Sequence, residues 1–152
     1  MSNNRTSIYV GEPLQRVLDH VGAENRSGRI NDIAGRYDAI ISDELARLSL
    51  TANEWAAIVD ANNGTFMHDE YGWRLAFANV QDTPELDAKW GVDRLELARK
   101  IGAPSIAMRA AVAEVIERFW SLSSSEGGHT RTLDQMLAQC GVTPCAPYRE
   151  AA

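Results

Sequence analysis

One short β-prone segment, "RTSIYV" at residues 5–10, most constrains how this chain folds. Its side chains alternate as in a half-buried strand, with Arg5, Ser7 and Tyr9 on one face and Thr6, Ile8 and Val10 on the other. Helical patterns follow it, and no partner strand is evident in the same chain. An isolated strand leaves its backbone N–H and C=O groups unpaired. The segment is therefore either a frayed tail or a strand whose partner comes from elsewhere, such as a second copy of the chain.

Two helical patterns follow this strand. Apolar residues at helical spacing predict a first helix over residues 12–21, with Pro13 in its first turn and Gly22 as its C-cap. A longer amphipathic pattern begins at Asn25 or Ser27 and extends to about residue 46. The N-terminal third therefore predicts a strand followed by two helices.

Helical signals continue to the end of the chain. Thr51 and Glu54 have the spacing of a capping box, and "NNG" at 62–64 ends the helix that begins there. The aromatic stretch 65–83 fits either a short helix or an irregular segment. Further helices are predicted over residues 83–90, 91–101, 105–122 and 130–141. The sequence therefore predicts a mainly α protein with one N-terminal strand.

Length and charge narrow the possible functions. The chain has 152 residues, 45% of them apolar, which fits one globular domain or one domain with a small appendage. Its formal net charge is −6, with 15 basic and 21 acidic residues, so any nucleic-acid contact has to come from a local arrangement. The N-terminus lacks the apolar region of a signal peptide, and no apolar run approaches the ~18 residues of a membrane span. We therefore expect a cytoplasmic protein without a membrane partner.

The residues suggest no reaction class. A Gly-x-Gly-x-x-Gly phosphate loop is absent, and the serines at 123–125 lack the strand–turn–helix context of an exposed nucleophile. The three histidines are scattered, and Cys140 and Cys145 lack the spacing and the second ligand pair of a zinc site. We therefore expect a protein that is not an enzyme and that binds no metal or cofactor. Cys140 is expected to be buried on the last helix.

Residues 5–46 resemble the ribbon-helix-helix family of MetJ/Arc-like DNA-binding proteins. The resemblance runs through the strand, the Gly-Glu-Pro turn at 11–13, a helix with the core pair Leu14 and Leu18, and "NRSGRINDI" at 25–33 opening the longer helix. In that family two chains pair their strands into an antiparallel ribbon, which implies a homodimer and supplies the missing strand partner. Physical reasoning agrees, because one strand with two helices buries too little apolar area alone.

The resemblance also implies which residues contact DNA. The ribbon of this family lies in the major groove, so the base-reading side chains here would be Arg5, Ser7 and Tyr9. The start of the second helix would hold a phosphate with its free N–H groups and its positive dipole end. The residues at that position are Asn25, Arg26, Ser27 and Arg29, of which Asn25 and Ser27 also suit ordinary N-capping. The implied dimer core comprises Ile8, Val10, Leu14, Leu18, Ile30, Ile33 and Tyr37.

These features predict three parts and two alternative functions. Residues 1–48 would form the dimerisation and DNA-binding module, residues 49–143 a helical domain, and residues 144–152 a loose tail. We expect a dimeric, sequence-specific DNA-binding protein that acts as a transcriptional regulator or as a plasmid or phage accessory factor. The alternative is a protein-binding inhibitor or adaptor from a mobile element. In that case the module would serve only to dimerise, and an acidic helical surface would bind a basic partner protein.

A second DNA-binding pattern lies further along the chain. Residues 95–112 loosely resemble a helix-turn-helix unit, with Gly102 in the turn. Such a unit would place the residues after Pro104, including Arg109, into a DNA groove. Two helices joined by a Gly-Ala-Pro turn also fit an ordinary helical hairpin.

Overall fold

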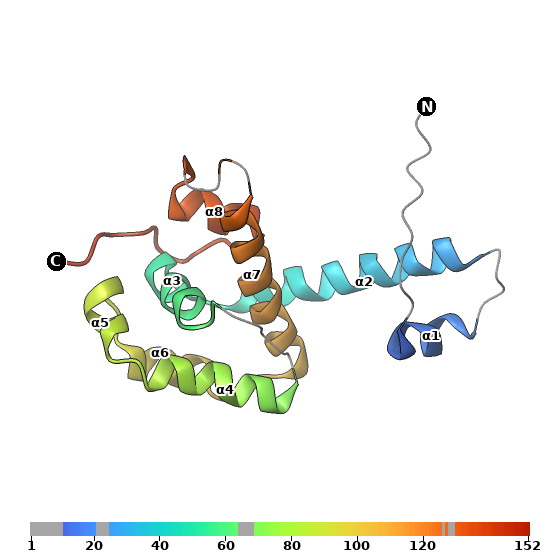
Figure 1. Cartoon of the computed structure of the whole chain (residues 1–152), viewed down its shortest axis with the longest axis horizontal. Helices are drawn as coiled ribbons and strands as arrows, with labels where there is room; N and C mark the ends of the chain where they lie inside the picture. Colours follow the sequence, from blue (N-terminus) through green and yellow to red (C-terminus); the bar gives the residue numbers. More distant parts are fainter. Residues whose placement is uncertain (1–10, 21–24, 64–68, 126, 128–129) are drawn as a thin grey trace. The chain divides into compact units, whose positions relative to one another are not determined.

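The computed structural model describes residues 11–20, 25–63, 69–125, 127 and 130–152. Within these ranges every regular element is an α-helix, and the chain divides into two compact units, residues 1–38 and 39–152. The helices are α1 (Glu12–Leu18), α2 (Arg26–Arg47), α3 (Ala52–Ala61), α4 (Glu70–Gln81), α5 (Glu85–Trp90), α6 (Arg94–Ile101), α7 (Ile106–Ser124) and α8 (Leu133–Gln139) (Figure 1). The predicted mainly α fold is confirmed for these residues, and the predicted strand at 5–10 lies outside them.

The first unit contains α1 and most of α2. α1 has Pro13 in its first turn, as predicted, but it ends at Leu18, three residues before the end of the apolar pattern. Asp19 is its C-cap and donates its backbone N–H to the carbonyl of Gln15 at 2.9 Å. Aspartate favours such an end because its short side chain competes with the helical backbone for hydrogen bonds. α2 is a continuous helix of 22 residues that begins within the predicted range.

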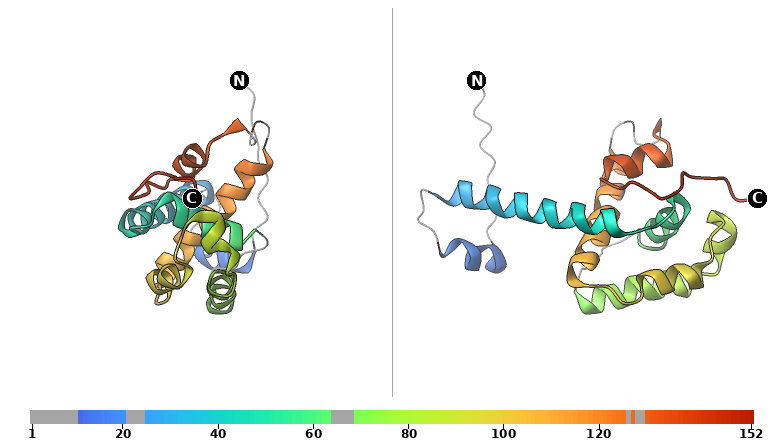
Figure 2. Two further views of the ribbon diagram at one scale, coloured as in Figure 1. Left: turned by 90° about the vertical axis from the view of Figure 1, so that its left-hand side faces the viewer. Right: turned by 180° about the vertical axis from the view of Figure 1, so that it is seen from behind.

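α3 forms the centre of the second unit. Six of its ten residues are buried, namely Ala52, Trp55, Ala56, Ala57, Ile58 and Val59. A helix that is apolar around most of its circumference has to be covered on several sides. α3 packs against α4, α5, α7 and α8, and it lies between α8 on one side and α4 with α6 on the other (Figures 1 and 2).

Polar contacts fix both ends of α3. The predicted capping box is confirmed: Thr51 Oγ1 accepts from the Glu54 N–H at 3.1 Å, and Glu54 Oε2 accepts from the Thr51 N–H at 2.9 Å. The other carboxylate oxygen of Glu54 binds Lys100 Nζ at 2.7 Å, which links α3 to α6. At the far end the buried Asn62 donates to a carbonyl of the last turn and accepts from Asn79 of α4. The orientation of α3 is thus set by hydrogen bonds as well as by packing.

The aromatic stretch that the sequence left open contains a helix. Asp69 is the N-cap of α4, and its Oδ1 accepts from the Gly72 N–H at 2.7 Å. α4 and α6 lie side by side and antiparallel, with Arg94 Nε donating to the carbonyl of Gln81 at one end (Figure 1). At the other end a Cβ on Gly102 would lie 3.3 Å from the ring of Phe77. The same Cβ would lie 3.0 Å from the carbonyl oxygen of Ala98 in α6, so a larger residue would crowd both helices at this point.

Residues 144–152 are held against α3 rather than loose, so this part of the sequence prediction is wrong. Two backbone hydrogen bonds of 2.9 Å, donated by the amides of Cys145 and Ala52, join the tail to the start of α3. The side chain of Asn53 also binds the backbone of Arg149. Its Oδ1 accepts from the Arg149 N–H at 3.0 Å, and its Nδ2 donates to the Arg149 carbonyl at 2.7 Å. Most of these contacts use backbone groups, and for that reason the side-chain pattern of the tail does not indicate them.

Replacing Asn53 by Ala should release the tail. The change removes two hydrogen bonds to the backbone of Arg149 and one, of 2.6 Å, to the carbonyl of Trp90. We expect the free energy of unfolding, measured by urea titration, to fall by about 1–3 kcal/mol. Asn63→Ala, at an exposed position after α3, is the matched control and should change it by less than about 0.5 kcal/mol. Equal losses in the two variants would contradict this role of Asn53.

Candidate nucleic-acid interface

The predicted interface divides into a part that the structure describes and a part that it does not. The base-reading residues Arg5, Ser7 and Tyr9, and the core residues Ile8 and Val10, lie outside the described residues. Their roles stay predictions.

The predicted phosphate-binding residues are brought together at the start of α2. Asn25 directly precedes the helix, and Arg26, Ser27 and Arg29 lie in its first four residues. All are exposed except Arg29, which is half-buried, and no acidic residue lies in the first turn. The first N–H groups of a helix lack intrahelical acceptors and carry the positive end of its dipole. This end of α2 therefore has the chemistry of an anion-binding surface.

An apolar stripe follows on the same helix. Ile30 and Ile33 are half-buried, whereas Tyr37 is 41% exposed and Ile40 is 51% exposed. Ile40 is not among the predicted interface residues, although its spacing of three from Tyr37 places it on the same helical face. In α1 the predicted core residues Leu14 and Leu18 are half-buried and buried, respectively.

The charge of the chain is divided between its two units. Residues 1–38 contain five basic and five acidic side chains, whereas residues 39–152 contain ten basic and sixteen acidic ones. The whole net charge of −6 therefore belongs to the second unit. Composition alone obscures this division, because a neutral module and an acidic unit average to a moderately acidic chain.

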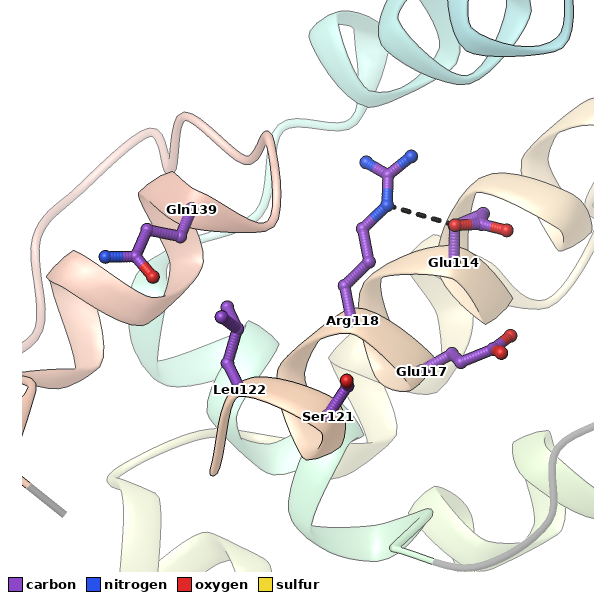
Figure 3. A pocket seen from close by; sticks show the side chains of 6 residues that line it. All are labelled: Glu114, Glu117, Arg118, Ser121, Leu122 and Gln139. Atoms are coloured by element: carbon purple, nitrogen blue, oxygen red, sulfur yellow. Dashed lines mark hydrogen bonds and ion pairs between the residues drawn. The ribbon is translucent and has the colours of Figure 1, made fainter. Parts of the chain in front are cut away.

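A shallow depression of about 340 Å³ lies between α7 and α8 (Figure 3). It is lined by Glu114, Glu117, Arg118, Ser121, Leu122 and Gln139. Arg118 Nε donates to Glu114 at 3.0 Å, and its Nη1 donates to the carbonyl of Cys140 at 3.2 Å, so this cation already has structural partners. The other polar groups that line it are two carboxylates, one hydroxyl and one amide.

In the second DNA-binding pattern, Arg109 does not project so that it could read bases in a DNA groove. α6 and α7 are joined through a turn, and Ser105 caps α7 by accepting from the Met108 N–H at 3.1 Å. Arg109 is half-buried, and its Nε atom is buried. A side chain that reads bases needs to project from the protein surface. α6 packs chiefly against α4, so α6 and α7 do not form a packed hairpin either.

The two cysteines lie in different surroundings. Cys140 is buried and Cys145 is exposed, and both are free thiols. Burial raises the pKa of the Cys140 thiol to about 11, although the guanidinium of Arg118 lowers it in part. Within the described ranges, no three His, Cys, Asp or Glu side chains are grouped so that they would hold a metal ion. In the same ranges no helix is long and apolar enough to cross a membrane.

Comparison with known proteins gives no further assignment. The chain matches no protein-family model, no curated protein and no solved structure.

The thiols should differ in reactivity. Because only the thiolate attacks a disulfide reagent, the raised pKa of Cys140 and its burial keep it unreactive in the folded protein. At about pH 8 we expect one thiol per chain to react rapidly with an aromatic disulfide and the second to react only after urea is added. Cys145→Ser should remove the rapid phase and Cys140→Ser the slow one. Two equally rapid thiols in the native protein would contradict the assignment.

The same raised pKa has a consequence for stability. Cys140 binds its proton more tightly in the folded state than in the unfolded chain, so the protonated thiol adds to the free energy of unfolding. This contribution is complete below the unfolded pKa near 9. It is lost as the pH rises from there through the folded value of about 11.

Proposed function

We propose that the chain is a dimeric ribbon-helix-helix protein that binds a specific DNA site in the cytoplasm. It would act as a transcriptional regulator or as a plasmid or phage accessory factor. The observation that carries the proposal is the arrangement along α2. Exposed groups suited to phosphate stand at its start, and an incompletely covered apolar stripe follows directly. These are the two surfaces that the module needs, one for DNA and one for a second copy.

The size of the first unit supports the proposed dimer. It spans residues 1–38, and chains below about 40 residues usually require a disulfide, a metal or a partner to form a stable core. Neither cysteine lies in this unit. A second copy would cover Ile30, Ile33 and Tyr37 and, by pairing strands, would satisfy the backbone of residues 5–10. Both the regulator function and the adaptor function require this dimer.

In the dimer, DNA recognition would be shared between two elements. The paired strands would place Arg5, Ser7 and Tyr9 against base edges in the major groove. The two starts of α2 would each hold a backbone phosphate through N–H groups, with Arg26 and Arg29 adding charge-assisted hydrogen bonds. The phosphate contacts would fix the register, and the ribbon would supply the sequence preference.

The charge distribution favours a second candidate function. All of the net charge of −6 lies in residues 39–152, so a dimer would present two acidic helical units. Such a surface attracts a basic protein and can compete with nucleic acid for it. In this alternative the module dimerises, and the helical units inhibit or recruit the partner.

The dimer can be tested with a charge placed on the apolar stripe of α2. Tyr37→Glu should shift the sedimentation-equilibrium mass from twice the protomer mass towards the protomer mass, because it buries an unpaired carboxylate in the proposed interface. Ala39→Glu introduces the same charge at an exposed position on the opposite face of α2 and should leave the mass unchanged. A wild-type monomer, or a dimer that survives Tyr37→Glu, would contradict this interface.

DNA binding can be tested with a fluorescent fragment from upstream of the gene of this protein, titrated at two salt concentrations against scrambled competitor. Arg5→Ala should weaken specific binding roughly tenfold, as for the loss of one base contact, with little effect on the scrambled fragment. Arg29→Ala should weaken binding to both fragments and reduce the salt slope by about one. Arg99→Ala, on an exposed side chain paired with Glu96, is the control and should change neither.

Two outcomes would count against the DNA-binding proposal. If Arg5→Ala changes neither affinity nor sequence preference, the ribbon does not read bases. If the wild type shows no saturable binding at either salt concentration but binds a basic protein, the adaptor function replaces the regulator.

A further inference from the structure

A second depression, of about 320 Å³, lies in the unit 39–152 beside the start of α4 and the turn between α6 and α7. It is lined by Glu70, Trp73, Arg74, Gly102, Pro104 and Arg109. It is separate from the residues proposed above to contact DNA, and its argument does not depend on that function.

Arg109 is the unusual group in this depression. It is half-buried, and its Nε atom is buried without a hydrogen-bond partner among the described residues. Other half-buried arginines of the same unit have partners: Arg94 binds Asp87 at 2.9 Å, and Arg118 binds Glu114 at 3.0 Å. A guanidinium that loses water without gaining an acceptor is unfavourable. An added acceptor that reached the Nε of Arg109 would therefore stabilise this side chain.

The neighbouring charges leave the depression positive. Arg74 Nη2 pairs with Glu70 at 2.6 Å, so these two lining side chains neutralise each other. The charge of Arg109 remains, although the unit as a whole is acidic. Trp73 and Pro104 add apolar surface, which lowers the local dielectric constant and strengthens an ionic contact with Arg109.

We propose that this depression binds a small oxyanion, with a phosphate group as the best match. A change in the Arg109 side-chain rotamer would turn its buried Nε towards the depression. The planar guanidinium would then donate Nε–H and one Nη–H to two oxygens in the bidentate geometry that arginine forms with phosphate and carboxylate. Arg74 would exchange part of its exposed pairing with Glu70 for a third oxygen. The volume of about 320 Å³ suits a compact anion and is too small for a duplex.

The test is the thermal unfolding of the full chain in chloride and in inorganic phosphate at matched ionic strength, which removes general screening effects. At a phosphate concentration about ten times the dissociation constant we expect the wild-type Tm to rise by roughly 4 °C. Arg109→Gln should abolish this rise. Arg99→Gln, at an exposed arginine of α6, is the matched control and should respond as the wild type does.

A second measurement separates a ligand site from a structural role for Arg109. In phosphate-free buffer Arg109→Gln should have a Tm equal to or above that of the wild type, because it removes a guanidinium whose buried Nε lacks a partner. Arg74→Gln, on a largely exposed side chain, should fold as the wild type does and show a reduced phosphate response. This variant keeps the proposal testable even if Arg109→Gln fails to fold.

The outcomes are distinct. An equal rise with acetate would support the oxyanion site and assign it to carboxylates as well as to phosphate. A wild-type Tm that does not respond to phosphate would overturn the proposal, as would an undiminished response in both Arg109→Gln and Arg74→Gln. Because the start of α2 is also proposed to hold phosphate, a rise that persists in Arg109→Gln and Arg74→Gln but is lost in Arg26→Ala would belong to that site. None of these measurements uses DNA, so the two proposals fail or succeed separately.

Discussion

The burial of α3 is the constraint on which the rest of the helical unit depends. A ten-residue helix with six buried residues has almost no solvent face, so its polar groups have to find partners in other helices. Glu54 binds Lys100 of α6, and Asp60 accepts from both Lys89 Nζ and Trp90 Nε1 of α5. Burial raises the pKa of Asp60, but the hydrogen bonds from Lys89 and Trp90 outweigh this effect and hold the pKa below its ordinary value. α3 thus holds α5, which packs against it, and is joined to α6 by the ion pair of Glu54 with Lys100.

The apolar side chains of α2 are covered unequally along the helix. Its apolar residues follow one helical spacing along its whole length, yet Ile41 and Leu45 are buried whereas Tyr37 and Ile40 are substantially exposed. Since the residue types are equivalent, the difference lies in what covers them. The end of α2 is covered by the core of the second unit, of which Ile41 and Leu45 are part. For the earlier turns a second copy of the chain would supply an equivalent apolar partner, and this is the physical basis of the proposed dimer.

The sequence predicts those features that are encoded within one helical turn. The capping box of Thr51 and Glu54, and the start of α7 at Ser105, depend on contacts over three residues, and both are confirmed. The hydrogen bonds between Asn53 and Arg149 join segments far apart in the chain, and so does the lining of the depression around Arg109. No local sequence pattern therefore indicates either feature. For the candidate interface, the helical pattern predicted that residues 25–29 open α2, and α2 begins at Arg26. The phosphate-binding role of these residues and the base-reading role of Arg5, Ser7 and Tyr9 stay predictions that rest on the resemblance.

The division of charge along the chain bears on both proposed functions. Attraction to phosphates supplies most of the affinity for non-specific DNA, and an acidic unit joined to the module opposes it. Base contacts are short-range and are affected less, so the acidic unit would lower non-specific binding more than specific binding. A net charge of −6 is therefore compatible with a sequence-specific regulator built on the neutral unit 1–38. The same charge is the attractive element of the adaptor function, so charge alone does not separate the two. The two functions differ in the partner that the dimer would bind. A regulator would place the two starts of α2 against two DNA phosphates, whereas an adaptor would place its two acidic units against one basic protein surface.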